Sequence, residues 1–199
     1  MNFGALRVLN DDRVEAGKGF GIHPHKNMEI ISIPLKGKLK HGDSNKNSRT
    51  ITIGDIQTMS AGTGIYHSEM NGSDTEPVEF LQIWVMPEKL NTPPAYRDYD
   101  IRPFLRKNEL ALIVSPDGDA PAKMLQQTWF SIGEIEAGKK IGYHMHQSHA
   151  GVYIFVIEGE VKVDDTVLSR RDGMGVYDTH SFELETLKDS HILLMEVPM

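Results

Sequence analysis

The stretch Gly17-Lys-Gly-Phe-Gly-Ile-His-Pro-His25 indicates how the chain is divided, because a related stretch returns in its second half. Gly138-Lys-Lys-Ile-Gly-Tyr-His-Met-His146 places a glycine and a His-x-His pair at the same spacing, 121 positions later. A second match, between Leu35-Lys-Gly-Lys-Leu39 and Ile157-Glu-Gly-Glu-Val161, has an offset of 122. A repeat of this length built from β-type segments is typical of two small β-barrels or sandwiches in tandem.

Short β-branched runs alternate with Gly, Asn and Asp turns along the chain, which predicts an all-β protein. The segment 86–108 contains four prolines and is expected to be a linker with at most a short helical turn. We therefore expect an N-terminal domain at 1–90, a linker at 91–109 and a C-terminal domain at 110–199. The predicted strands are 28–35, 38–41, 50–53, 78–86, 111–114, 126–132, 152–157, 160–163 and 192–197.

The composition narrows the classes of function. The formal net charge of −7 argues against a direct nucleic-acid interface, and Lys36, Lys38 and Lys40 alternate on a predicted solvated strand face. The absence of cysteine excludes disulfides and thiolate sites, so that His, Asp and Glu remain as metal ligands. Neither a signal peptide nor an apolar run of about 18 residues is present, so we expect a cytoplasmic protein without a membrane span.

Two short motifs form the candidate metal site. His23-Pro-His25 and His67-Ser-Glu69 offer three imidazoles and one carboxylate in two i, i+2 pairs. Side chains two positions apart on a strand point to the same face, so the four groups can be aimed at one ion. We predict a metal bound by His23, His25, His67 and Glu69, with positions left open for water, oxygen or a chelating substrate. A lone histidine is more often simply hydrogen-bonded, but the joint pattern disfavours that alternative.

Strand parity predicts the surroundings of this site. His23 and His25 share their odd numbering with four residues of the next strand, which are expected to face the barrel interior with them: Glu29, Ile31, Ile33 and Leu35. Pro24 between the two histidines is expected to mark a bulge or a strand entry. The apolar wall of the pocket is expected to come from Phe20, Met28, Ile65, Phe80 and Trp84.

A second histidine cluster lies in the other half of the repeat, at His144, His146 and His149. It has no His-x-Glu partner, and His180 is its one candidate for a further ligand. We therefore expect the C-terminal domain to lack a complete metal site, with a second metal as the less favoured alternative.

Several longer blocks resemble the pirin family of the cupin superfamily, and together they cover essentially the whole chain. They are Phe3-Gly-Ala-Leu-Arg-Val-Leu-Asn-Asp-Asp12, Gly19-Phe-Gly-Ile-His-Pro-His25, Asn27-Met-Glu-Ile30, Met59-Ser-Ala-Gly-Thr-Gly-Ile-Tyr-His-Ser-Glu-Met70, Thr75-Glu-Pro-Val78, Phe80-Leu-Gln-Ile-Trp84, Pro93-Pro-Ala-Tyr96 and Leu110-Ala-Leu-Ile-Val-Ser115. The resemblance implies a bicupin, which is two tandem jelly-roll-like cupin barrels. Pirins carry a further N-terminal segment before the first block, so we expect a shortened or truncated member with an open sheet edge that invites pairing with another chain.

The resemblance also implies a function. In the family one metal is held in the N-terminal barrel by the positions that match His23, His25, His67 and Glu69. It is usually taken to be Fe(2+), and manganese, nickel, copper, cobalt and zinc stay open. Bacterial pirins are associated with quercetin 2,3-dioxygenase activity, whereas nuclear relatives act as transcriptional cofactors.

We therefore expect a flavonol and dioxygen as substrates, with Glu69 as the general base that takes the flavonol 3-hydroxyl proton. The alternative is a metal- or redox-sensing regulatory protein with a protein partner. A sugar-isomerase-type cupin is a weaker third option, and a homo-oligomer stays open. The native metal and the physiological substrate are left undetermined by the sequence.

Overall fold

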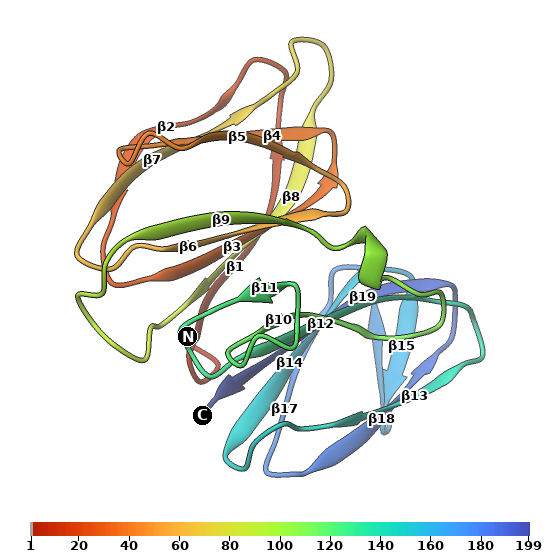
Figure 1. Ribbon diagram of the computed structural model, residues 1–199. Helices are drawn as coiled ribbons and strands as arrows, with labels where there is room; N and C mark the ends of the chain where they lie inside the picture. The colour runs from red at the N-terminus through yellow and green to blue at the C-terminus, as the bar shows by residue number, and fades with distance from the viewer. Residues whose placement is uncertain (1) are drawn as a thin grey trace.

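The structure is a computed structural model that describes residues 2–199, and its regular secondary structure is almost entirely β-strand (Figure 1). Two barrels lie side by side, and each is made of one larger and one four-stranded sheet. The N-terminal barrel pairs a sheet of order β1-β8-β3-β6-β9 with one of order β2-β7-β4-β5. Its strands are β1 (Leu6–Val14), β2 (Gly19–His25), β3 (Glu29–Lys36), β4 (Lys38–Asp43), β5 (Ser48–Thr52), β6 (Asp55–Ser60), β7 (Ile65–Asn71), β8 (Val78–Val85) and β9 (Ala95–Asp100).

The C-terminal barrel pairs a sheet of order β11-β10-β12-β19-β14-β17 with one of order β13-β18-β15-β16. A short 3-10 helix, η1 (Arg102–Phe104), precedes it. Its strands are β10 (Ala111–Ser115), β11 (Ala122–Lys123), β12 (Trp129–Ile135), β13 (Lys140–His144), β14 (Ala150–Glu158), β15 (Glu160–Val163), β16 (Thr166–Ser169), β17 (Gly173–Tyr177), β18 (Ser181–Thr186) and β19 (Ser190–Pro198). Within residues 2–199, no helix is long and apolar enough to cross a membrane.

The sequence repeat corresponds to a structural repeat. Gly37 and Gly159 occupy the tight turns that join β3 to β4 and β14 to β15, with φ of 75° and 92°. A Cβ atom on Gly37 would lie 2.6 Å from the carbonyl oxygen of Pro77, and one on Gly159 would lie 2.3 Å from that of Asp189. Both turns therefore require glycine for the left-handed backbone and for the close approach of a neighbouring strand. The prediction of an all-β protein with two tandem barrels is confirmed.

Each of the nine predicted strands overlaps an observed one, but the expectation for the segment 86–108 is partly wrong. Instead of at most a helical turn, it contains β9, which pairs antiparallel with β6. β9 occupies the edge of its sheet and begins after the adjacent prolines 93 and 94, so that no ladder hydrogen bond is lost to proline. The domain limits 1–90 and 110–199 with a linker at 91–109 stay a proposal.

The two larger sheets pack face to face and share one hydrophobic core. Fully buried residues of the N-terminal sheet, among them Ile31 and Leu81, join the same cluster as Phe130 and Leu193 of the C-terminal sheet. This shared core explains why the barrels lie side by side as one body in Figure 1.

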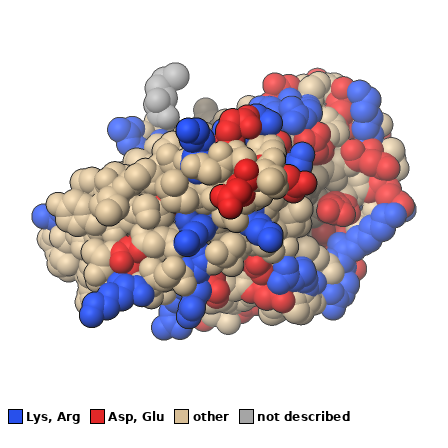
Figure 2. All heavy atoms as spheres, turned by 90° about the horizontal axis from the view of Figure 1, so that it is seen from above, with Lys and Arg blue, Asp and Glu red and all other residues tan. Residues whose placement is uncertain are grey.

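Polar contacts cross the same boundary. The Arg171 Nε lies 3.0 Å from Asp11 Oδ2, and the amide of Ala5 donates to the Pro198 carbonyl at 2.9 Å. On the outer face shown in Figure 2, side chains of both charges are interspersed, consistent with 21 Lys and Arg against 28 Asp and Glu in the whole sequence.

The predicted parity between β2 and β3 is wrong. Ile31 and Ile33 point into the core between the barrels, whereas the even-numbered Ile30 and Ser32 face the interior of the N-terminal barrel. The reason is that β2 and β3 belong to different sheets, and the chain crosses from one to the other between residues 25 and 29. Alternation applies along one strand and is not carried through such a crossing.

Candidate metal centre

The histidines of β2 and β7 converge inside the N-terminal barrel. The two strands are antiparallel neighbours, and His23 lies opposite His67 in their register. The ring centroids of His23, His25 and His67 lie 4.4 to 4.8 Å apart. The Nε2 atoms of His23 and His67 are 2.9 Å apart. Two nitrogens bound at right angles to one ion, each at about 2.1 Å, would lie about 3 Å apart, so this spacing fits a shared metal.

The hydrogen bonds of the imidazoles also fit an ion. The Nδ1 of His23 is 2.8 Å from the Gly21 carbonyl oxygen, which can only accept. Nδ1 therefore carries the proton and leaves the lone pair on Nε2. The Nε2 of His25 is buried and has no hydrogen-bond partner among residues 2–199. Leaving such a group unsatisfied costs about 1–3 kcal/mol, and a bound metal would supply the missing partner.

Glu69 lies next to His67 but faces a cage of donors. Its side chain is 1% exposed. Its Oε1 accepts hydrogen bonds of 3.0 Å from the Ser32 hydroxyl and from the Gln57 amide, and its Oε2 accepts one from the Gln82 amide. One Glu69 oxygen lies within 4.8 Å of a ring nitrogen of His67, but the carboxylate is not equally close to all three histidines.

Two further side chains fix the direction of these amides. The Tyr96 hydroxyl donates to Gln57 Oε1 at 3.2 Å, and the Trp84 indole donates to Gln82 Oε1 at 3.1 Å. Each amide must therefore turn its N–H group toward Glu69. The cage is thus arranged for an acceptor, which is the ionised carboxylate.

His41 was not singled out in the sequence, and the structure places it in the site. It lies on β4 opposite Glu69 of β7 and is 1% exposed. Its Nε2 is 3.0 Å from Asp43 Oδ2, and its ring stacks on Tyr96 at 4.1 Å. The sequence did contain a signal for it. A solvated lysine face on alternate positions of this strand implies that the intervening positions, 39, 41 and 43, face inward.

Burial keeps the imidazoles neutral. It lowers the pKa of His25 to about 4, with the neighbouring His23 as the second cause. It lowers the pKa of His67 to about 3, with the surrounding imidazoles adding to the effect. Burial also lowers the pKa of His41, against the opposing influence of Asp43. Neutral imidazole is the form that binds metals, so His25 and His67 could bind an ion at pH 7 without first losing protons.

Burial has the opposite consequence for the carboxylate. It raises the pKa of Glu69, while the hydrogen bonds from Ser32 and Gln82 act in the other direction. A carboxylate whose proton affinity is increased in this way is suited to accept a proton from a bound substrate.

The apolar wall agrees with the prediction at three of five positions. Met28, Ile65 and Trp84 pack together beside the histidines, and the Trp84 ring meets His25 edge to face at 4.9 Å. Phe20 is instead 43% exposed, and an irregularity in the β2–β7 register separates it from His23. Phe80 is buried in a different cluster and precedes Trp84 by four residues on β8.

The C-terminal histidines are arranged differently. His144, His146 and His149 are exposed. The groups of three or more metal-ligand side chains found within residues 2–199 both lie in the N-terminal barrel. The Nδ1 of His146 is 2.8 Å from the fully buried carboxylate of Glu196, which also accepts a 2.9 Å bond from the Tyr143 hydroxyl.

Comparison with known proteins identifies the family. The Pirin profile matches residues 1–85, and the profile of the quercetinase C-terminal cupin domain matches residues 112–197. A protein of Escherichia coli (strain K12) named quercetin 2,3-dioxygenase is 38% identical over 203 residues, which cover 100% of this chain and 84% of that protein. The chain belongs to the pirin family. A pirin-like protein of Caulobacter vibrioides is 33% identical, over 98% of this chain and 84% of its own length.

Solved pirin structures confirm the fold. The crystal structure of YhhW from Escherichia coli superposes with a TM-score of 0.93 at 38% identity, covering 100% of this chain and 83% of that one. A structure of the bacterial pirin YhhW in complex with nickel(II) gives a TM-score of 0.92 at 36% identity, over 100% and 84% of the two chains. The resemblance stated from the sequence and the tandem cupin architecture are both confirmed.

Proposed function

We propose that this pirin is a metal-dependent dioxygenase that acts on a flavonol, with one divalent ion bound by His23, His25, His67 and Glu69. The observation that carries the proposal is the 2.9 Å spacing of the His23 and His67 Nε2 atoms, together with the buried Nε2 of His25, which has no hydrogen-bond partner among residues 2–199. The substrate class is supported by the relatives named quercetin 2,3-dioxygenase. The nickel(II) complex of a related pirin supports a divalent ion, for which we favour Fe(2+).

A divalent ion in this position supplies Lewis acidity, which lowers the pKa of a coordinated hydroxyl and activates the flavonol toward dioxygen. His23, His25 and His67 would hold the ion through their imidazole nitrogens. Glu69, whose pKa burial raises, takes the proton of the flavonol 3-hydroxyl. In the overall reaction both atoms of dioxygen enter the ring-opened product, and the carbon that carried the 3-hydroxyl leaves as carbon monoxide.

The surrounding residues position the reactants. The donor cage of Ser32, Gln57 and Gln82 stabilises the carboxylate before it accepts the proton, and it remains in place to orient the acid that results. Trp84 and Met28 offer an apolar surface for the aromatic rings of a flavonol and keep water away from the reacting carbons.

The test is to compare metal-free protein with protein reconstituted with Fe(2+) or Ni(2+). Loss of flavonol absorbance, oxygen uptake and carbon monoxide release are measured, together with the metal content by elemental analysis. We expect turnover with metal only, and an anaerobic shift of the flavonol spectrum that is absent in Glu69→Ala and His67→Ala. Full turnover by the metal-free protein would show that the proposal is wrong.

A further inference from the structure

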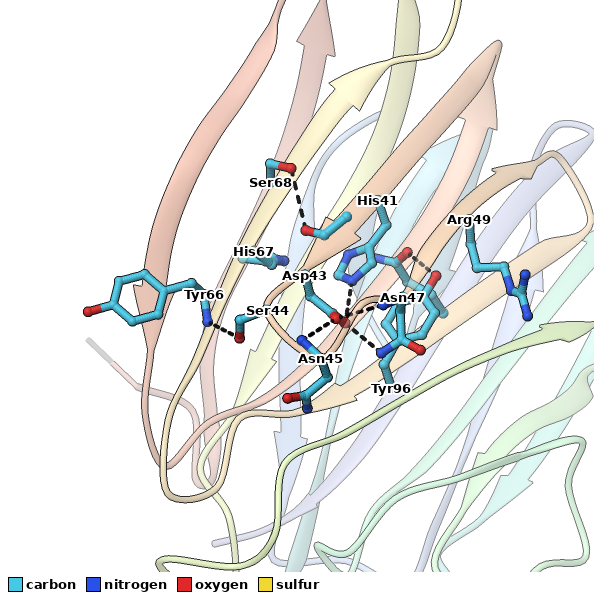
Figure 3. A network of polar contacts seen from close by, with 12 residues as sticks. His41, Asp43, Ser44, Asn45, Asn47, Arg49, Tyr66, His67, Ser68 and Tyr96 are labelled. Carbon is cyan, nitrogen blue, oxygen red and sulfur yellow. Dashed lines mark hydrogen bonds and ion pairs between the residues drawn. The ribbon is translucent and has the colours of Figure 1, made fainter.

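Next to His67 lies a network of hydrogen-bonded side chains, centred on His41 and Asp43, that the proposed mechanism does not use (Figure 3). The side chains of His41 and Asp43 are both completely buried, and His41 Nε2 lies 3.0 Å from Asp43 Oδ2. Asp43 is fixed by the turn between β4 and β5, because it also accepts hydrogen bonds of 2.8 to 3.0 Å from the backbone amides of Asn45 and Asn47 and from the Asn47 side chain. The position of its carboxylate is therefore independent of any ion.

These contacts determine which nitrogen of His41 carries the proton. A carboxylate can only accept, so His41 donates from Nε2 to Asp43. The Nδ1 of the neutral ring is then a bare acceptor, and it is buried with no partner among residues 2–199. The Nδ1 of His67 is also buried and without a partner in the same part of the chain. If His67 binds an ion through Nε2, its Nδ1 carries a proton and is a donor.

The ring that carries the unsatisfied acceptor lies close to the ring that carries the unsatisfied donor. The ring centroids of His41 and His67 are 5.4 Å apart, and one ring nitrogen of each lies within 4.8 Å of the other. The stack of His41 on Tyr96, with planes only 16° apart, prevents the ring from turning away. Rings at this separation leave a distance between polar atoms that one bridging water molecule can span.

We propose that His41 and Asp43 are positioning residues that fix the tautomer of His67 through one buried water, so that His67 presents its Nε2 to the metal. The inference rests on the proposed metal centre. Hydrogen bonds to the outer nitrogen of a ligand imidazole orient the ring and increase its basicity, and losing them typically costs 10- to 100-fold in metal affinity. His23 obtains the equivalent support from the Gly21 carbonyl.

The first experiment measures the dissociation constant of Ni(2+) by calorimetry. We expect His41→Leu to weaken binding by about 10- to 100-fold, because leucine removes the acceptor. His41→Asn is expected to stay within a few-fold of the wild type, because the asparagine oxygen occupies the place of Nδ1. Asn45→Ala is the matched control, since Asn45 is exposed and donates to Asp43 through its backbone amide, which alanine keeps, and it should bind Ni(2+) as the wild type does.

Asp43→Asn tests the tautomer directly and serves if His41→Leu fails to fold. An amide that turns its N–H group toward Nε2 of His41 would move the ring proton to Nδ1, where it faces the Nδ1–H of His67. Two donors then oppose each other, and we expect a loss of affinity similar to that of His41→Leu.

The second experiment uses Zn(2+) as a diamagnetic probe. Long-range proton–nitrogen spectra of the loaded wild type should show three metal-bound imidazoles, a proton on Nδ1 of His67 and one on Nε2 of His41. Four metal-bound imidazoles would make His41 a ligand and overturn the positioning role, as would wild-type affinity in both His41→Leu and Asp43→Asn. If the wild type binds no ion, the proposed function itself fails. If the wild type binds an ion and the variants bind it equally well, only the positioning role fails.

Discussion

Replacing His23 by glutamine should remove most of the stabilisation that a bound metal gives to this fold, while leaving the metal-free protein nearly unchanged. His23 is only partly buried, and its Nδ1 contact to Gly21 is a single hydrogen bond at the barrel mouth. In the metal-free protein its loss therefore costs about 0.5–1.5 kcal/mol. His144 occupies the equivalent place in the sequence repeat and is exposed, so His144→Gln is the matched control.

The magnitude follows from the linkage of binding to folding. A metal held at about 1,000 times its dissociation constant stabilises the native state by about 4.1 kcal/mol. If the loss of one of four ligands weakens binding by about 100-fold, the same concentration of metal gives only about 1.4 kcal/mol. The difference of about 2.7 kcal/mol corresponds to about 5–11 °C in Tm for a chain of this length.

The assay is calorimetric unfolding of the wild type and both variants, with chelator and with saturating metal. We expect the wild type and His144→Gln to gain equally in Tm from the metal, and His23→Gln to gain far less. The decisive quantity is the difference in Tm with and without metal within each variant. This difference is independent of any effect that the substitution has on the metal-free protein. An undiminished shift in His23→Gln would refute the assignment of this imidazole as a ligand.

Three further predictions address the same centre and the core that supports it. The metal-free protein should lose stability as the pH falls from about 6.5 toward 4, because the pKa values of His25 and His67 are lowered in the folded state and the unfolded chain therefore binds protons first. The raised pKa of Glu69 opposes this loss at pH values above its ordinary value of 4.5, and chemical denaturation at several pH values measures the slope. Leu81→Ala should destabilise by about 2–5 kcal/mol and should still give one unfolding transition, since this residue is buried in the core that both barrels share; two separate transitions would contradict that. Trp84→Phe keeps an aromatic wall but removes the donor that orients an amide of the cage, so Ni(2+) affinity should fall by about 10-fold, with unchanged affinity as the contrary result.

That the members of each candidate ligand pair share one face of a strand could be predicted, because this depends only on local strand geometry. His23 and His25 lie on one strand and His67 and Glu69 on another, and alternation alone places each pair on one face. The pairing of β2 with β7 then brings three of the four together without further information from the chain. The repeated glycine turns likewise predict two barrels, because Gly37 and Gly159 each occupy a turn that requires a left-handed backbone.

The surroundings of Glu69 could not be predicted in this way. Its three donors, Ser32, Gln57 and Gln82, come from the opposite sheet and lie 37, 12 and 13 positions away. Which strands face one another across a barrel depends on topology, and periodicity along one strand carries no information on it. The wrong parity of Ile31 has the same origin, because it assumed that two consecutive strands belong to one sheet.

The two barrels differ in whether their buried polar side chains find hydrogen-bond partners within the protein. In the C-terminal barrel the buried carboxylate of Glu196 accepts from Tyr143 and His146, and the histidine cluster is exposed to solvent. In the N-terminal barrel three imidazole nitrogens of the described chain remain buried and unpaired, on His25, His41 and His67. Such groups are costly in a metal-free fold and are retained where a ligand satisfies them. One barrel therefore encloses a carboxylate that is satisfied by protein donors, whereas the other encloses imidazole nitrogens that a cation and a water would satisfy.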